Sequence, residues 1–121
     1  YIPHGGGPCF FMDWSPIGPK DTWEKMATWL KGIRSTLPES PRALILVSAH
    51  WEESEFTLLD HENPSLLFDY SGFPKHTYEL TYPARVDRKL VFLIAEKMKS
   101  LGIESRRDHS RGFDHGVFIP L

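Results

Sequence analysis

The chain has 121 residues, of which 40% are hydrophobic and 25% are charged, an ordinary balance for a globular protein. Its net charge of -2 argues against nucleic-acid binding, which a clustered basic surface normally accompanies. No apolar run approaches the roughly 20 residues that a membrane-spanning helix needs. Cys9 is the single cysteine, so no disulfide can form within the chain. We therefore expect a cytoplasmic protein whose partners are neither nucleic acid nor membrane.

The first third of the chain predicts a loop followed by a helix. Residues 1–20 are rich in Gly and Pro, which favours a loop. Asp21, with Glu24 three residues later, is a capping pattern for a helix that runs to about Thr36. Its apolar side chains recur at helical spacing: Trp23, Met26, Trp29, Leu30, Ile33 and Leu37. Pro38 and Pro41 would end this helix.

The rest of the chain predicts further strands and one more helix. Residues 43–49 are continuously apolar, as in a strand buried on both faces of a helix-covered parallel sheet. Residues 56–59 predict a shorter strand, and residues 60–84 predict a long irregular loop. An amphipathic helix over residues 87–101, capped by Gly102, would face inward with Leu90, Leu93, Ile94, Met98 and Leu101. Residues 103–106 and 117–119 predict two more strands.

This alternation predicts an α/β fold with a central, mostly parallel sheet flanked by helices. The chain starts without methionine and stops inside an apolar run, so we expect an incomplete domain. The alternative is a chain trimmed to its ordered part. In α/β sheets, ligands gather at the carboxyl ends of strands. His50 would lie there, and so would His4 if a strand ends near Pro3.

Two histidines occupy contexts typical of sites. His4 precedes three glycines, which let the backbone pass close to a ligand. A flexible loop beside an incidental histidine explains the same pattern. His50 directly follows the predicted buried strand, where it would be held as rigidly as a metal ligand requires. The alternative is a histidine that caps the strand by hydrogen bonding to a carbonyl group.

A third histidine and a group of aromatic residues are further candidates. His115 follows Asp114 between two glycines, which suits proton transfer or an imidazole polarised by a carboxylate. A turn built from Gly and Asp explains the pattern equally well. Tyr70, Phe73 and Tyr78, from the predicted loop, could bind a flat substrate or could anchor the loop to the core. Nothing near Cys9 in the sequence would lower its pKa, so we do not expect a nucleophile there.

Taken together, four motifs resemble the class III extradiol ring-cleavage dioxygenases of the LigB-like superfamily, and especially the branch of the 4,5-DOPA extradiol dioxygenases. The motifs are His4-Gly-Gly-Gly-Pro, Ser48-Ala-His-Trp-Glu, Gly72-Phe-Pro with Tyr82-Pro-Ala, and Gly112-Phe-Asp-His-Gly. The resemblance covers essentially the whole chain, and the ordered set is more specific than any single motif. One departure is Arg85-Val86, where the family has Pro-Gly.

The resemblance implies a mononuclear metal centre, with Fe(II) for activity and Zn(II) in isolated homologues. His4 and His50 would be metal ligands, and His115 would be a catalytic residue. The implied reaction cleaves the ring of a catechol, such as a DOPA-like substrate, next to the diol and incorporates both atoms of O2. Members of the family are longer than this chain. We therefore expect residues 1–121 to be the N-terminal part of a single catalytic domain, with the third metal ligand outside the chain.

Three other functions stay open at this point, because a fold does not fix a function. The same scaffold could carry a non-catalytic metal-binding or signalling protein. The chain could be an inactive fragment that holds a metal weakly. A hydrolase that uses zinc-bound water is the third alternative.

Overall fold

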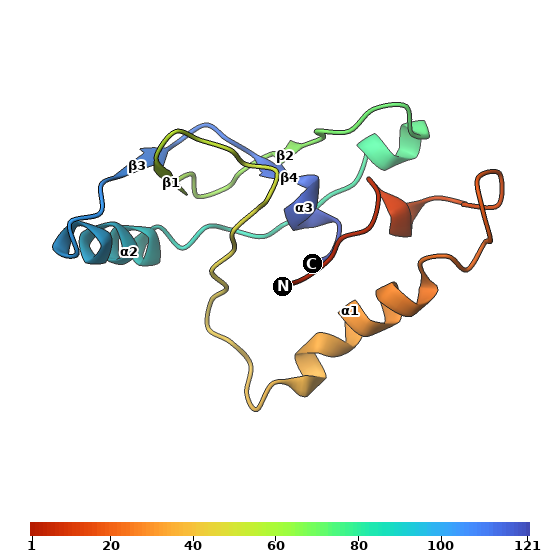
Figure 1. Cartoon of the computed structure of the whole chain (residues 1–121), viewed down its shortest axis with the longest axis horizontal. Coiled ribbons are helices and arrows are strands. Elements are labelled where there is room, and N and C mark those ends of the chain that lie inside the picture. Colours follow the sequence, from red (N-terminus) through yellow and green to blue (C-terminus); the bar gives the residue numbers. More distant parts are fainter.

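A computed structural model describes all 121 residues as a small mixed α/β structure (Figure 1). The helices are α1 (Glu24–Thr36), α2 (Arg88–Ser100) and α3 (His115–Phe118). The strands are β1 (Phe56–Leu59), β2 (Leu66–Leu67), β3 (Ser105–Asp108) and β4 (Phe113–Asp114). Two short 3-10 turns are η1 (Cys9–Phe11) and η2 (Lys75–Tyr78). The α/β class predicted from the sequence is thereby confirmed.

The strands form two parallel pairs. β1 pairs with β3, from Phe56 opposite Ser105 to Leu59 opposite Asp108. β2 pairs with β4 over two residues. α2 packs against both β1 and β3, as a helix must when it links strands that run in the same direction. The predicted strand at 103–106 is therefore present, although it begins two residues later.

The buried core lies around α3 and the turn η1. Its buried hydrophobic residues are Cys9, Val117, Phe118 and Ile119. The Phe118 ring packs edge-on against Phe68 at a centroid distance of 5.5 Å, which ties α3 to the irregular segment after β2. The first residue of α3, His115, lies beside the N-terminal segment, with its ring centroid 4.9 Å from that of His4.

α2 forms close to where the sequence predicts it. The Asp87 side chain accepts hydrogen bonds from the backbone N–H groups of Lys89 and Leu90, as an N-cap residue should. Gly102 follows the helix with a φ of +72°, in the left-handed region that ends many helices. Leu90, Ile94 and Met98 are half-buried, but the predicted inward residues Leu93 and Leu101 are each 62% exposed. The prediction that these two side chains face inward is therefore wrong.

α1 ends at Thr36 as predicted but begins later than its sequence pattern suggests. The residue before it is Trp23, and no side chain caps its first turn. Thr22 instead donates hydrogen bonds from both its N–H and its hydroxyl group to the Pro19 carbonyl, so a turn occupies residues 19–22. The prediction that Asp21 is the N-cap is therefore wrong. Trp29 and Leu37, predicted on the apolar face, are exposed.

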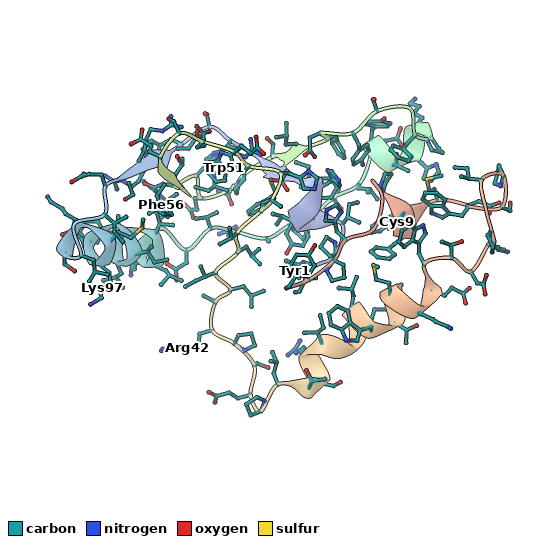
Figure 2. The ribbon with its side chains drawn as sticks, viewed as in Figure 1. Tyr1, Cys9, Arg42, Trp51, Phe56 and Lys97 are labelled. Atoms are coloured by element: carbon teal, nitrogen blue, oxygen red, sulfur yellow. The ribbon has the colours of Figure 1, made fainter.

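Residues 43–49 do not form the predicted buried strand. They lie in the segment, yellow in Figure 1, that connects α1 to β1 and has no strand partner. Leu44, Ile45 and Leu46 are exposed, and Val47 is 96% exposed. Figure 2 shows side chains projecting from this segment on the stretch between Arg42 and Trp51. The prediction fails because an apolar run becomes a buried strand only when another backbone pairs with it, and none of these 121 residues does so.

The prediction of a strand at 117–119 is also wrong. Val117, Phe118 and Ile119 are buried as expected. However, residues 115–118 form α3, and the Ile119 N–H donates to the His115 carbonyl. A short apolar run is compatible with either a strand or a buried helix, and periodicity alone cannot separate the two.

No helix of the structure has both the length and the apolar composition that a membrane span requires.

The Asp87 cap gives a direct test of what holds α2 in place. Asp87→Ala removes the carboxylate that accepts from Lys89 and Leu90, and should lower the free energy of unfolding by about 1 kcal/mol, within a range of about 0.5–2. Asp87→Ser should retain most of this stability, because the serine hydroxyl can also accept a hydrogen bond from the backbone N–H groups. Urea unfolding followed by circular dichroism measures both. Equal stability of all three proteins would contradict the capping role.

Candidate metal centre

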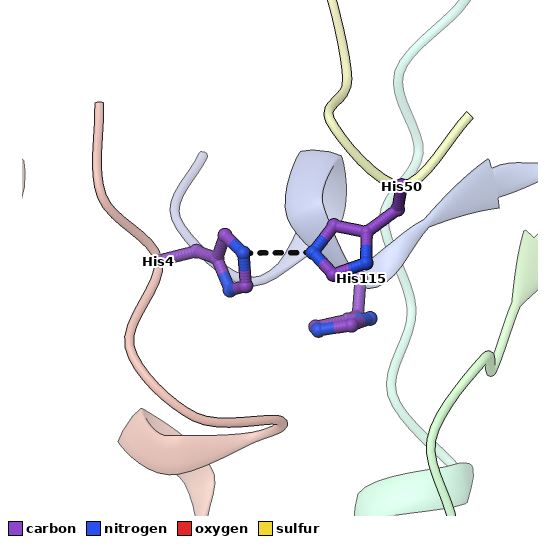
Figure 3. Close-up of side chains that lie close together, drawn as sticks. All are labelled: His4, His50 and His115. Carbon is purple, nitrogen blue, oxygen red and sulfur yellow. Dashed lines mark hydrogen bonds between the residues drawn. The ribbon is translucent and has the colours of Figure 1, made fainter. Parts of the chain in front are cut away.

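Three histidines from distant parts of the chain meet at one place (Figure 3). His4 precedes the turn η1, His50 ends the segment that follows α1, and His115 is the first residue of α3. One ring nitrogen from each lies within 4.8 Å of the others. These are the three histidines that the sequence singled out. The structure therefore brings together all three, while their chemical roles stay predictions.

The turn after His4 explains why glycine follows it. Gly5 and Gly7 both have positive φ, +74° and +53°, which residues with a Cβ rarely adopt. A Cβ on Gly5 would lie 2.5 Å from the Cys9 sulfur, so the turn packs tightly. The Cys9 thiol donates to the His4 carbonyl at 3.3 Å. Burial raises the pKa of Cys9 to about 11, which keeps the thiol protonated and, as predicted, unsuited to act as a nucleophile.

Asp69 orients His115. One oxygen of its carboxylate accepts from the His115 backbone N–H at 2.9 Å and from Nδ1 of the same ring at 2.7 Å. Burial opposes ionisation of Asp69, but the hydrogen bonds from His115 outweigh it and lower the pKa of Asp69. Because an ionised carboxylate only accepts hydrogen bonds, Nδ1 must carry the proton. The neutral His115 ring therefore has its lone pair on Nε2.

The same carboxylate faces His50. Its second oxygen lies 3.7 Å from the His50 Nδ1, which is too long for a hydrogen bond but close enough for electrostatic attraction. That contact favours a proton on Nδ1 of His50 as well. The lone pair of His50 then lies on Nε2, which is 2.9 Å from Nε2 of His4. Asp69 thus favours the tautomer with the lone pair on Nε2 in both His50 and His115.

The residues present fit a metal ion. Two imidazole nitrogens that bind one metal at about 2.0–2.1 Å and at right angles are about 2.9 Å apart, which matches the separation between His4 and His50. A direct N–H···N hydrogen bond, drawn in Figure 3, has the same length. Burial, and then the nearby His115 and His50, lower the pKa of His4, which favours its neutral ring. Neutral imidazole suits iron and zinc alike.

The aromatic residues predicted to bind substrate form one cluster, and only Tyr70 contacts the histidines. Its ring centroid lies 5.6 Å from that of His115. Its hydroxyl donates to the Thr77 carbonyl, and the Tyr78 hydroxyl accepts from the Phe73 N–H at 3.4 Å. Both hydroxyl groups therefore stabilise the loop, which is the alternative that the sequence left open. Substrate binding by Tyr70, Phe73 and Tyr78 stays a prediction.

Asp69 is the functional residue that the sequence analysis missed. It lies between two aromatic residues in the predicted loop, 46 residues before His115. No fixed spacing links a carboxylate to the histidine it orients across such a distance. The only local signal was a charged residue in an otherwise aromatic segment, which is too common to identify a site.

Comparisons with known proteins point to one family. The family model described as the catalytic LigB subunit of aromatic ring-opening dioxygenase matches residues 1–121. The chain is 37% identical to the dioxygenase tasH of Hapsidospora irregularis over 99% of its own length. It is 30% identical to the 4,5-DOPA dioxygenase extradiol of Beta vulgaris over 100% of its length, and 31% identical to that of Portulaca grandiflora over 77%. It spans 37%, 42% and 34% of these relatives, respectively.

Removal of one imidazole tests whether the cluster binds metal. His50→Ala should weaken Zn(II) binding by about 100-fold or more, because the loss of a direct ligand exceeds the 10- to 100-fold effect of losing an outer partner. Competition titration with a chromogenic chelator measures the affinity. His76→Ala is the control, since His76 is exposed and its ring hydrogen-bonds to the Phe11 carbonyl rather than to the cluster. Equal Zn(II) affinity of His50→Ala and the unchanged protein would refute a metal site here.

Removal of the Asp69 charge tests how the imidazoles are oriented. Asp69→Asn keeps the size of the side chain, but its amide group no longer favours Nδ1–H on both histidines. We expect Zn(II) affinity to fall by about 10- to 100-fold, with little change in the thermal midpoint because the side chain is partly exposed. Asp13→Asn, which changes an exposed carboxylate that accepts hydrogen bonds from Ser15, serves as the control. An unchanged affinity in Asp69→Asn would show that the carboxylate has no such role.

Proposed function

Because the chain belongs to the LigB family of aromatic ring-opening dioxygenases, we propose that the whole protein cleaves the ring of a catechol next to its diol and incorporates both atoms of O2. The observation that carries this proposal is the meeting of His4, His50 and His115, whose ring nitrogens lie within 4.8 Å of one another. An extradiol dioxygenase needs a metal held on one side by protein ligands, with positions left for its substrates.

His4 and His50 are the proposed metal ligands. Their Nε2 atoms are 2.9 Å apart, and burial helps to keep His4 neutral. A bound Fe(II) would supply the electron transfer that lets dioxygen react with a catechol, while Zn(II) would bind without redox activity. The family resemblance implies a third ligand outside this chain, which stays a prediction.

His115 is the proposed proton-transfer residue. With Nδ1 bound to Asp69, its Nε2 is free to take a proton from a catechol hydroxyl. The Asp69 carboxylate would stabilise the imidazolium that forms, and would hold the ring in place throughout. The His115 side chain is only 8% exposed, so bulk water would compete little for this proton.

The catechol class is proposed from the relatives. Several matched proteins are named 4,5-DOPA dioxygenase extradiol, which supports a DOPA-like catechol as substrate. The aromatic cluster around Tyr70 lies beside His115 and could contact the flat face of such a ring. We also propose that residues 1–121 are the N-terminal part of a single catalytic domain. A cytoplasmic location is likewise a prediction.

Oxygen consumption with a panel of catechols, after anaerobic loading with Fe(II), tests the reaction. The whole protein should take up oxygen and form a ring-opened product with DOPA-like catechols, and His50→Ala should abolish the uptake. No uptake by the whole protein, despite tight metal binding, would favour the non-catalytic metal-binding alternative. Ester or amide hydrolysis without oxygen would favour the hydrolase instead.

His115→Gln separates the proton-transfer role from metal binding. Loss of a general base should lower kcat by about 100- to 10,000-fold. Zn(II) affinity should stay within the range of the control His76→Ala, because His115 is not a proposed ligand. If Zn(II) affinity instead falls as far as in His50→Ala, His115 is a metal ligand and the proton-transfer assignment is wrong.

A further inference from the structure

His50 lacks the support that a strand would give it. The segment before it forms no strand, and residues 44–47 are exposed. A metal ligand must nevertheless be held within a fraction of an ångström, about 0.5 Å, for the metal to bind tightly. Some other part of the molecule must therefore fix the main chain at His50.

That support comes from one buried carboxylate. Asp114, the last residue of β4, is 2% exposed. One of its oxygens accepts from the Ser48 hydroxyl at 2.8 Å, and the Ser48 oxygen in turn accepts from the His50 backbone N–H at 3.2 Å. The amide group of His50 is thus connected to Asp114 through a single side chain.

The other side of His50 is connected to the same carboxylate. The Arg111 guanidinium donates to the second Asp114 oxygen at 3.2 Å and to the His50 carbonyl at 3.4 Å. It also lies over the Trp51 ring, 4.8 Å from the centroid, a cation–π contact that restricts its position. Both backbone polar groups of His50 are therefore held by side chains that meet on Asp114.

The His50 ring is supported from the same segment. A Cβ on Gly116 would lie 2.7 Å from the His50 Cδ2 and 3.2 Å from the Ser48 oxygen, so only glycine leaves room for this contact. Asp114 is also the residue directly before His115. A single short segment, residues 111–116, thereby sets the position of His50 relative to His115.

We propose that Asp114 is a positioning residue that fixes His50 for metal binding by holding its main chain through Ser48 and Arg111. This inference rests on the proposed metal centre. Asp114 contacts neither a ring nitrogen of the cluster nor the reacting atoms, so it acts only through the two intermediate side chains. The contacts are directional, and removing either one should loosen His50 without removing any metal ligand.

Metal binding by the whole protein tests the proposal without relying on catalysis. Asp114→Asn keeps the volume but replaces one acceptor oxygen by an amide group that cannot accept. Its Zn(II) affinity should fall by about 10- to 100-fold, and the visible absorption of bound Co(II) should change because the coordination geometry is less fixed. Ser48→Ala removes one connection only and should show a smaller loss in the same direction.

Two controls separate positioning from general destabilisation. Asp60 is 3% exposed and bonds Arg88 at 2.7 Å, yet contacts none of the three histidines. Asp60→Asn should therefore lower the thermal midpoint while leaving Zn(II) affinity unchanged. Ser15→Ala removes an exposed serine–aspartate hydrogen bond of 2.8 Å, the same length as that between Ser48 and Asp114, and should alter neither property.

A double-mutant cycle makes the test specific. If Ser48 acts through Asp114, Ser48→Ala should cost less Zn(II) affinity in the Asp114→Asn background than in the unchanged protein. Full affinity in both single variants, or an equal loss in Asp60→Asn, would overturn the inference. If the unchanged protein binds neither Zn(II) nor Co(II), the proposed metal centre itself is refuted. If it binds metal and Asp114→Asn does not change the affinity, only the role of Asp114 is refuted.

Discussion

Two residue pairs join β2 to β4, Leu66 with Phe113 and Leu67 with Asp114, and the geometry of the histidine cluster depends on them. Asp69 follows β2 by two residues, and His115 follows β4 directly. Because the register aligns these two strand ends, the Asp69 carboxylate reaches both donors of His115. A slip of one residue would turn every side chain of β4 to the opposite face and separate the two groups. Main-chain pairing thus determines a contact between side chains.

The sequence predicts well those features that depend on neighbouring residues. The cap at Asp87 and the glycine after α2 are local signals, and both appear in the structure. The residues next to His4, His50 and His115 indicate a site in each case, and the fold brings the three histidines together. Residues 43–49 show the limit of such reasoning. Their apolar pattern indicates that burial would be favourable, but burial requires a partner, and the pattern contains no information about whether one is present.

Asp69 and Asp114 could not have been assigned from the sequence for a related reason. Each contacts a residue that is distant along the chain. Asp69 bonds to His115, 46 residues away, and Asp114 bonds to Ser48, 66 residues away. Because Asp114 adjoins His115, the sequence suggests that it polarises that ring. In the structure, Asp69 instead hydrogen-bonds to the His115 ring, and Asp114 is linked to the His50 main chain through Ser48 and Arg111. Adjacency in sequence is thus a poor guide here, because a strand ends at Asp114 and a helix begins at His115, and the two side chains have different partners.

The hydrogen bond from Cys9 to the His4 carbonyl has a chemical consequence if the protein reacts with dioxygen as proposed. With a pKa of about 11, the Cys9 thiol is ionised in only about one molecule in ten thousand at pH 7. Reaction of cysteine with oxidants proceeds through the thiolate, so the one sulfhydryl group of the chain is protected from sulfenic acid formation. The turn that carries a proposed iron ligand would therefore contain a sulfur atom that reacts only slowly with peroxide, if the proposed reaction released any.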